Sequence, residues 1–257
     1  MKIVHLAVQG KGGTGKTLIS AVTAQYLISH YNAGDIHLFD TDPINQSFSR
    51  YKALNVEVVN IVGANGVIDH SKFDMLIEEI INRNGIALID SGSTTFLPLM
   101  QYIKENGVLE VLNEHGVEVI FHIPLQGGGG FSDTIEGLRT ILDTLPVKVV
   151  VWLNHNQGEI VFNTKNLIEK YPNKIIGVCE IKNRQGDLYD SDIRRMTENH
   201  LTLEEIKQST DPQWRLMSKQ RINIFYRDID EQLAKITLFD TAVKKSAAKG
   251  TEKETAA

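Results

Sequence analysis

The stretch Gln9–Thr17 reads QGKGGTGKT and decides the fold. It follows a short apolar run, IVHLAV at residues 3–8, and precedes a helical pattern, and from Gly10 onward it fits G-x-x-x-x-G-K-[ST]. Between a strand and a helix, such glycines let successive backbone N–H groups point at phosphate oxygens, and the helix N-terminus favours an anion. The pattern predicts a phosphate-binding loop that consists of Gly10, Lys11, Gly12, Gly13, Thr14, Gly15, Lys16 and Thr17.

The two lysines of this loop have different expected roles. Lys16 occupies the position that contacts the β- and γ-phosphates of a nucleotide, and Thr17 offers a hydroxyl to Mg²⁺. Lys11 lies between two glycines, at a position where the plain loop tolerates many side chains. From the residues alone, Lys11 is either a solvated loop residue or a second cation aimed at phosphate.

Aspartates end two further apolar runs. The segment HLFDTDPINQ places Asp40 and Asp42 at alternate positions, and GIALIDSGSTT ends its apolar run at Asp90. In phosphate-loop proteins such aspartates hold Mg²⁺ or its waters, and one orients the attacking water. A helix-capping or turn role is the alternative for each aspartate taken singly. Their shared place at strand ends favours a ligand site, in which Thr17, Asp40, Asp42 and Asp90 are the candidates for holding the metal or orienting the water.

Short Val/Ile-rich runs recur along the chain with helical segments between them. Because these runs are continuously apolar, we expect strands that are covered on both faces, and therefore an α/β fold with a mostly parallel sheet flanked by helices. The expected strands are 2–8, 36–39, 56–62, 86–89, 117–123, 147–153 and 174–178. The expected helices are 16–30, 44–53, 72–83, 97–105, 132–144, 164–171 and 212–237. We expect residues 1–240 to form one domain and residues 241–257, which are charged and rich in small side chains, to form a disordered tail.

The composition of the chain disfavours several classes of protein. The chain has 257 residues, 42% hydrophobic content and a formal net charge of -5, which disfavours a globally basic nucleic-acid binder. Its single cysteine, Cys179, excludes an intramolecular disulfide and the paired cysteines of an iron–sulfur carrier. With neither a signal peptide nor an apolar run of ~18 residues, we expect a cytoplasmic protein without direct membrane contact.

Two weaker signals each leave two interpretations open. LQGGGGFSD at residues 125–133 is either a second anion-binding nest or a mobile loop. Basic residues in the C-terminal region form either a solvated helix face or a patch for DNA or a partner, and they are Arg194, Arg195, Arg215, Lys219, Arg221 and Arg227.

Several of these stretches resemble one family. KGGTGKT resembles the deviant Walker A motif of the ParA/MinD ATPases, FDTDP resembles their switch I, and IALIDSG resembles their Walker B and switch II segments. The resemblance covers most of the chain. Within the family it is strongest toward the TraL-type ATPases of conjugative plasmids, through QGKGGTGK, DTDPINQSF, YKALNV, VVWLN and SKQRI.

The resemblance implies specific roles. Lys11 would reach across a dimer interface to the phosphates of the partner's nucleotide, so that ATP is sandwiched between two subunits. Lys11, Lys16 and Asp42 would be the catalytic residues, with Asp42 positioning the hydrolytic water. Asn154, after the VVVWL strand, would contact adenine, although a turn role is its alternative. Relatives often carry an Ile-Pro pair near the adenine, where this chain has VCEIKN.

The expected function is therefore an ATPase with ATP and Mg²⁺ as cofactors, slow and stimulated by a partner. It would form an ATP-dependent homodimer and act in conjugative plasmid DNA transfer, with conjugation machinery proteins as partners and DNA as a further one. One alternative is a plasmid partition or positioning ATPase that binds DNA or membrane. Others are a P-loop kinase, disfavoured by Lys11 and by the lack of tyrosine in residues 227–257, and a protein that binds ATP without turnover.

Overall fold

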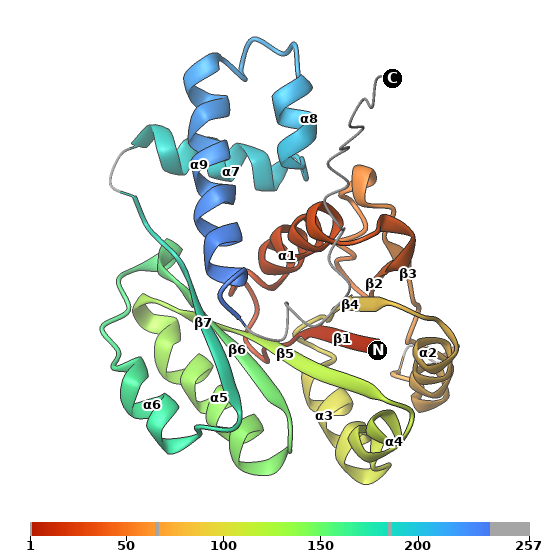
Figure 1. Ribbon diagram of the computed structural model, residues 1–257. Helices are drawn as coiled ribbons and strands as arrows, with labels where there is room; N and C mark the ends of the chain where they lie inside the picture. The colour runs from red at the N-terminus through yellow and green to blue at the C-terminus, as the bar shows by residue number, and fades with distance from the viewer. Residues whose placement is uncertain (1, 65–66, 185–186, 237–257) are drawn as a thin grey trace, which may run out of the picture.

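The computed structural model describes residues 2–64, 67–184 and 187–236. In this part of the chain, seven parallel strands form one sheet in the order β3-β2-β4-β1-β5-β6-β7 (Figure 1). Their bounds are β1 Lys2–Ala7, β2 Ile36–Asp40, β3 Glu57–Val58, β4 Ile86–Asp90, β5 Val117–Gln126, β6 Lys148–Asn154 and β7 Ile175–Ile181. Each strand falls on an apolar run expected from the sequence, and the predicted α/β fold is confirmed.

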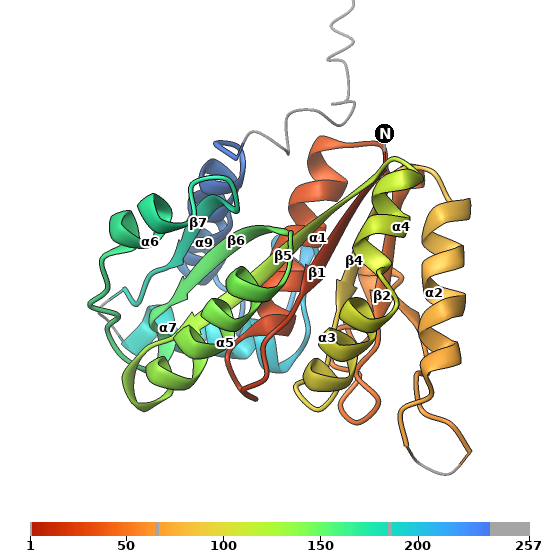
Figure 2. The same cartoon turned by 90° about the horizontal axis from the view of Figure 1, so that it is seen from below.

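Helices cover both faces of this sheet, as Figures 1 and 2 show from two directions. One face carries α1 (Lys16–His30), α7 (Asp187–Glu198), α8 (Leu203–Gln208) and α9 (Leu216–Leu233). The other face carries α2 (His70–Asn82), α3 (Phe96–Glu105), α4 (Val108–Glu114), α5 (Phe131–Thr144) and α6 (Thr164–Lys170). Because parallel strands need crossover connections, this two-sided wrapping follows from the alternation of strands and helices along the chain.

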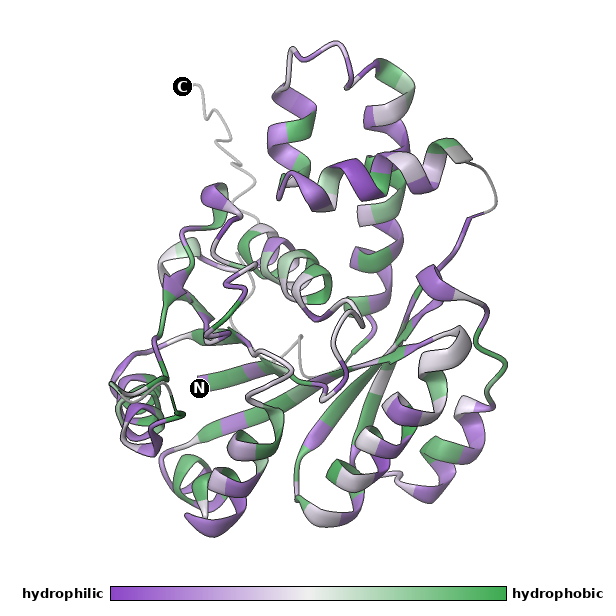
Figure 3. Ribbon diagram, turned by 180° about the vertical axis from the view of Figure 1, so that it is seen from behind, coloured by the Kyte–Doolittle hydropathy of each residue, from purple (hydrophilic) through white to green (hydrophobic). Residues whose placement is uncertain are grey.

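Two hydrophobic cores lie on opposite faces of the sheet. Side chains alternate along β1, so that Val4 and Leu6 pack in the core beneath α2–α6 while Ile3 packs in the core beneath α1 and α7–α9. Figure 3 shows the hydrophobic strands enclosed by helices with hydrophilic outer faces. Trp152, fully buried on β6, anchors the α1 side of the sheet. This burial on both faces explains why the strand sequences are continuously apolar.

The segment after β2 corrects one expectation. The predicted helix 44–53 is absent, and the chain instead forms turns followed by a short 3₁₀ helix, η2 (Lys52–Leu54). The Asp42 carboxylate accepts hydrogen bonds from the backbone N–H groups of Ile44 (2.9 Å) and Asn45 (3.0 Å). These contacts resemble those of a helix N-cap, but Gln46 has a φ of +41°, in the left-handed region, so the chain turns before a helix can propagate. The expected strand 56–62 is correspondingly short, only Glu57–Val58.

The C-terminal helices also differ from expectation. The predicted helix 212–237 forms as α9, but α4, α7 and α8 were not predicted, because each is short or weakly apolar. A capping box fixes the start of α8, where the Thr202 side chain and the Glu205 side chain exchange hydrogen bonds with backbone amides. The proposed tail 241–257 lies outside the described residues.

Three of the six basic residues singled out in this region form hydrogen bonds within the chain that tie helices together. Asp192, 3% exposed, accepts from Arg221 Nε at 2.6 Å and from Arg195 Nη1 at 3.3 Å, which ties α7 to α9. The Lys219 ammonium donates to the carbonyl oxygens of Lys207 and Ser209 at the end of α8. These contacts favour a structural role for the three cations over a nucleic-acid patch. Among the described helices, none is long and apolar enough to cross a membrane.

Candidate nucleotide site

The predicted phosphate loop connects β1 to α1 and has the backbone conformation that its glycines allow. Gly13 and Gly15 have φ values of +72° and +93°, in the left-handed region that favours glycine. Gly15 is the N-cap of α1, so the loop ends at a helix N-terminus. A Cβ on Gly15 would lie 2.6 Å from Nδ2 of Asn154, so a larger residue there is excluded by contact as well as by φ.

Lys16 lies inside this loop. Its residue is only 8% exposed, and its ammonium donates to the backbone carbonyl of Lys11 at 3.3 Å. Burial lowers the pKa of Lys16, while the nearby carboxylates of Asp90 and Asp42 oppose that shift. The ammonium is therefore held at the centre of the loop between two strand-end carboxylates, where it can meet phosphate oxygens.

Three polar side chains converge beside Lys16 at the start of α1. The buried Asp90 carboxylate accepts from Thr17 Oγ1 at 2.8 Å and from Ser20 Oγ at 2.8 Å. Burial raises the pKa of Asp90 to about 7, against the lowering effect of these hydrogen bonds. A hydroxyl and a carboxylate oxygen are hard ligands of the kind that Mg²⁺ prefers, and a cation here would compensate the buried charge. The donor set thus fits the predicted metal.

Asp40 and Asp42 lie differently although they are two residues apart. The fully buried Asp40 carboxylate accepts from the backbone N–H of Asp42 at 3.0 Å and of Ser49 at 2.9 Å, so it holds both ends of residues 42–49. Burial raises the pKa of Asp40. Asp42 is half-buried and packs against the segment after β4, since a Cβ on Gly92 would lie 2.8 Å from its Cγ. We call residues 42–49 the Asp42 segment.

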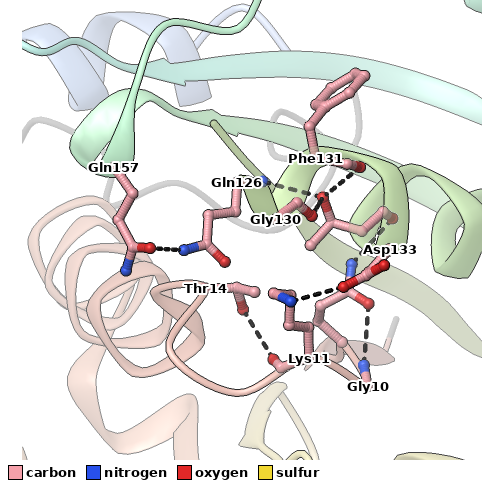
Figure 4. A network of polar contacts seen from close by, with 10 residues as sticks. Gly10, Lys11, Thr14, Gln126, Gly130, Phe131, Asp133 and Gln157 are labelled. Atoms are coloured by element: carbon pink, nitrogen blue, oxygen red, sulfur yellow. Dashed lines mark hydrogen bonds and ion pairs between the residues drawn. The ribbon is translucent and has the colours of Figure 1, made fainter. Parts of the chain in front are cut away.

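Lys11 points away from the Lys16 side of the loop, toward α5. Its ammonium forms an ion pair with the Asp133 carboxylate at 2.6 Å, and both side chains are partly exposed, at 35% and 59% (Figure 4). Asp133 lies in the first turn of α5. The first lysine of the loop is therefore neither a free solvated cation nor directed at its own phosphate pocket.

Asn154, at the end of β6, lies behind the phosphate loop. The residue is 5% exposed, and its Nδ2 donates to the carbonyl oxygen of Thr14 at 2.9 Å. Its Oδ1 accepts from the backbone N–H of Asn156 at 3.1 Å. In this arrangement the amide supports the loop from below. The adenine contact stays a prediction.

Two glutamines that the sequence analysis did not single out complete the framework. Gln9, 2% exposed, accepts from the backbone N–H of Gly10 and donates to the carbonyl oxygens of Pro124 and Thr134, which ties the loop to β5 and α5. Gln126 is bonded to Gln157 across the loops that follow β5 and β6 (Figure 4). The position of Gln9 between an apolar strand and the glycine loop could have suggested a buried amide. Its partners could not be predicted, because they lie more than 100 residues away in the sequence.

The glycine run after β5 is packed against a neighbouring loop. Gly128–Gly130 forms a 3₁₀ turn, η3, that leads into α5. A Cβ on Gly127 would lie 1.8 Å from the carbonyl oxygen of Gly158, so the two backbones touch. The structure shows a third use of these glycines, the close approach of two backbones, and the choice between an anion-binding nest and a mobile loop stays a prediction.

Thus the structure brings Lys16, Thr17, Asp42 and Asp90 together at the carboxyl edge of the sheet. Asp40 supports the Asp42 segment from within the core, Asn154 supports the loop, and Lys11 occupies the α5 side. Gly10, Gly12, Gly13, Thr14 and Gly15 form the loop backbone between them.

Comparisons with known proteins agree with the sequence resemblance. Two curated proteins, each named Protein TraL and from Escherichia coli, are 34% and 32% identical to this chain over 241 residues. Each alignment covers 91% of this chain and 98% of the relative. No family model matches the chain.

Solved structures give more distant similarities. A plasmid partition protein from Borrelia burgdorferi, bound to AMPPNP, is 14% identical with a TM-score of 0.44, over 77% of this chain and 95% of that one. The ParA protein of pNOB8, bound to nonspecific DNA, is 15% identical with a TM-score of 0.41, over 94% of this chain and 100% of that one. The family assignment rests on the curated relatives, whose similarity extends through nearly their whole length: the chain belongs to the TraL family.

Proposed function

We propose that this TraL-family protein binds and hydrolyses ATP with Mg²⁺, dimerises on ATP, and acts in conjugative plasmid DNA transfer. The observation that carries the proposal is the convergence of the buried Lys16 ammonium, the Thr17 hydroxyl and the Asp42 and Asp90 carboxylates around a glycine loop at a helix N-terminus. This combination of donors suits a nucleoside triphosphate with its cation.

Each residue has a role that follows from its position. The loop amides and Lys16 bind and orient the phosphates, and Thr17 and Asp90 hold the cation, which would neutralise developing phosphate charge. Asp42 lies half-exposed beside Lys16 and accepts hydrogen bonds through Oδ1. Its carboxylate orients the attacking water by accepting a hydrogen bond from it. Asn154 keeps the loop in its binding conformation through its hydrogen bond to the carbonyl oxygen of Thr14.

Dimerisation follows from Lys11. A cation supplied by a second subunit offsets γ-phosphate charge only when two loaded subunits face each other, so ATP stabilises the pair. In this proposal Lys11 leaves its ion pair with Asp133 to reach the phosphates of the partner's nucleotide. The transfer role rests on TraL membership, with cytoplasmic location and partner proteins of the conjugation machinery as parts of the same proposal.

The decisive test is Lys16→Ala. We expect this variant to lose ATP binding, measured by isothermal titration calorimetry, while its far-UV circular dichroism spectrum stays that of the wild type. The matched control is Lys52→Ala, which removes an exposed lysine outside the loop. Tight ATP binding by folded Lys16→Ala would refute the assignment. Phosphate release by the wild type, with and without DNA and conjugation proteins, then measures turnover and its stimulation.

A further inference from the structure

The Asp42 segment contacts the expected cation site through a residue that has no role in the proposal above. Ser47 Oγ lies 2.8 Å from Thr17 Oγ1, which in turn donates to Asp90 Oδ2 at 2.8 Å. Since the single Thr17 proton is used toward Asp90, Ser47 is the donor in the first contact. Three oxygen-bearing side chains from three separate parts of the chain therefore meet at one point.

The spacing of these oxygens matches the coordination geometry of Mg²⁺. An octahedral Mg²⁺ with ligands at about 2.0–2.1 Å has neighbouring ligand oxygens roughly 2.9 Å apart. The distances from Thr17 Oγ1 to Ser47 Oγ and to Asp90 Oδ2 are both 2.8 Å. Ser47 and Thr17 are each half-buried, so neither hydroxyl is enclosed in the core.

We propose that Ser47 is a second hydroxyl ligand of the cation, which joins Thr17 when nucleotide is bound and thereby ties the Asp42 segment to the metal. The inference rests on the proposed function, because the cation arrives with the nucleotide. Ser47 needs only to turn its proton away from Thr17 to present a lone pair, and no backbone movement is required.

The consequence concerns Asp42. Asp40 holds the backbone at Asp42 and Ser49, and Ser47 lies between these two attachment points. Ligation of Ser47 would fix the segment at a third point, beside the residue that orients water. Metal binding and the placement of Asp42 would then be coupled through the backbone of residues 42–47.

Thiol substitution tests this directly. Ser47→Cys replaces a hard ligand with a soft one, so it should bind nucleotide poorly with Mg²⁺ and recover with Cd²⁺. The matched control is Ser49→Cys, because the Ser49 hydroxyl donates to the carbonyl of Gln46 and not to Thr17. The native Cys179 is buried and sequestered from added Cd²⁺.

The readout is the dissociation constant of a fluorescent ATP analogue in EDTA, in Mg²⁺ and in Cd²⁺. We expect Ser47→Cys and Ser47→Ala to match the wild type in EDTA and to lose on the order of tenfold of the Mg²⁺-dependent gain in affinity. Cd²⁺ should restore that gain in Ser47→Cys but not in Ser47→Ala, and Ser49→Cys should follow the wild type.

Two results would overturn the inference in different ways. If Ser47→Ala keeps the full Mg²⁺ dependence, or if Cd²⁺ treats the Cys and Ala variants alike, Ser47 is not a ligand although the proposed function stands. If the wild type itself shows no gain with Mg²⁺, the metal-dependent function fails and the inference fails with it.

Discussion

The ammonium of Lys11 lies 2.6 Å from the carboxylate of Asp133, so the first lysine of the phosphate loop is paired within its own chain to the first turn of α5. Both groups are partly exposed, and such pairs contribute only ~0.2–1 kcal/mol. In the proposed dimer, the nucleotide of the second subunit would compete with Asp133 for Lys11. The ion pair would then oppose dimerisation only weakly.

Removing the Asp133 carboxylate, which competes for Lys11, should favour the proposed dimer. We expect Asp133→Asn to lower the dimer dissociation constant in ATP and Mg²⁺ by up to about fivefold per released lysine, the equivalent of ~1 kcal/mol.

Lys11→Ala should still bind ATP but stay monomeric, because a charge-assisted contact worth ~1.5–3 kcal/mol is lost twice in a symmetric pair. Sedimentation velocity in an Asp42→Ala background measures both. Equal dimer fractions for Lys11→Ala and its parent would show that Lys11 has no role in assembly.

Asp42→Ala should separate binding from turnover. The carboxylate makes hydrogen bonds only to the backbone of its own segment in the described structure, so its loss should leave ATP affinity within about threefold while phosphate release falls by ~10²–10⁴, the range for general acid–base catalysis. Asp35→Ala, an exposed aspartate outside the site, is the control. Unchanged phosphate release would move the water-orienting role to another carboxylate.

Asn154→Ala distinguishes a loop support from a base contact. Its Nδ2 holds the carbonyl of Thr14, so its loss should weaken ATP, GTP and inorganic triphosphate binding by a similar factor, about fivefold for one hydrogen bond of ~1 kcal/mol. Calorimetric titration with the three ligands measures this. A loss confined to ATP would instead assign Asn154 to adenine recognition.

A buried histidine pair should make stability depend on pH. His5 Nδ1 and His122 Nε2 lie 2.9 Å apart in the core, and Trp152 Nε1 donates to His122 Nδ1 at 3.0 Å. Burial lowers the pKa of His5 to about 3 and the pKa of His122 well below its usual value. The unfolded chain takes up these protons near pH 6.5, so stability is full above that pH and is lost as the pH falls toward the folded pKa.

The expected slope is ~1.4 kcal/mol per pH unit for each histidine below about pH 6. Urea unfolding between pH 7.5 and 5 measures it, and His5→Gln should make the slope shallower by one histidine. His115→Gln, at an exposed position, should keep the wild-type slope. A His5→Gln profile parallel to the wild type would show that the pair is not the source of the acid sensitivity.

Patterns local in sequence were enough to predict the sheet and the phosphate loop. Strands such as β4 are buried on both faces, and a strand buried in this way has a continuously apolar sequence that can be recognised directly. The helix α1 was predicted to the residue, because it starts where a glycine in the left-handed region ends the loop. Position at the end of a strand or the start of a helix was enough to predict that Lys16, Thr17 and Asp90 lie in the site.

Contacts between distant parts of the chain were beyond such patterns. Asp133 is 122 residues from Lys11, and the partners of Gln9 lie on β5 and α5, so neither role is visible in a short window. The helix wrongly expected at 44–53 has a different origin, because the interruption is local: Gln46 has a φ of +41°, and the N–H of Ser49 donates to the Asp40 carboxylate nine residues earlier. A residue with a left-handed backbone outweighs a helix propensity of a few tenths of a kcal/mol per residue.

The backbone contact between Gly127 and Gly158 joins two loops on one side of the site. With hydrogen as the only side chain at the contact, the loops after β5 and β6 interlock, and Gln126 and Gln157 bond across them. On the other side, the Asp42 segment is held by the fully buried Phe48 side chain and by hydrogen bonds at Asp42, Ser47 and Ser49. A side chain introduced at Gly127 would therefore displace both of the joined loops, while the Asp42 segment would keep its own attachments to the core.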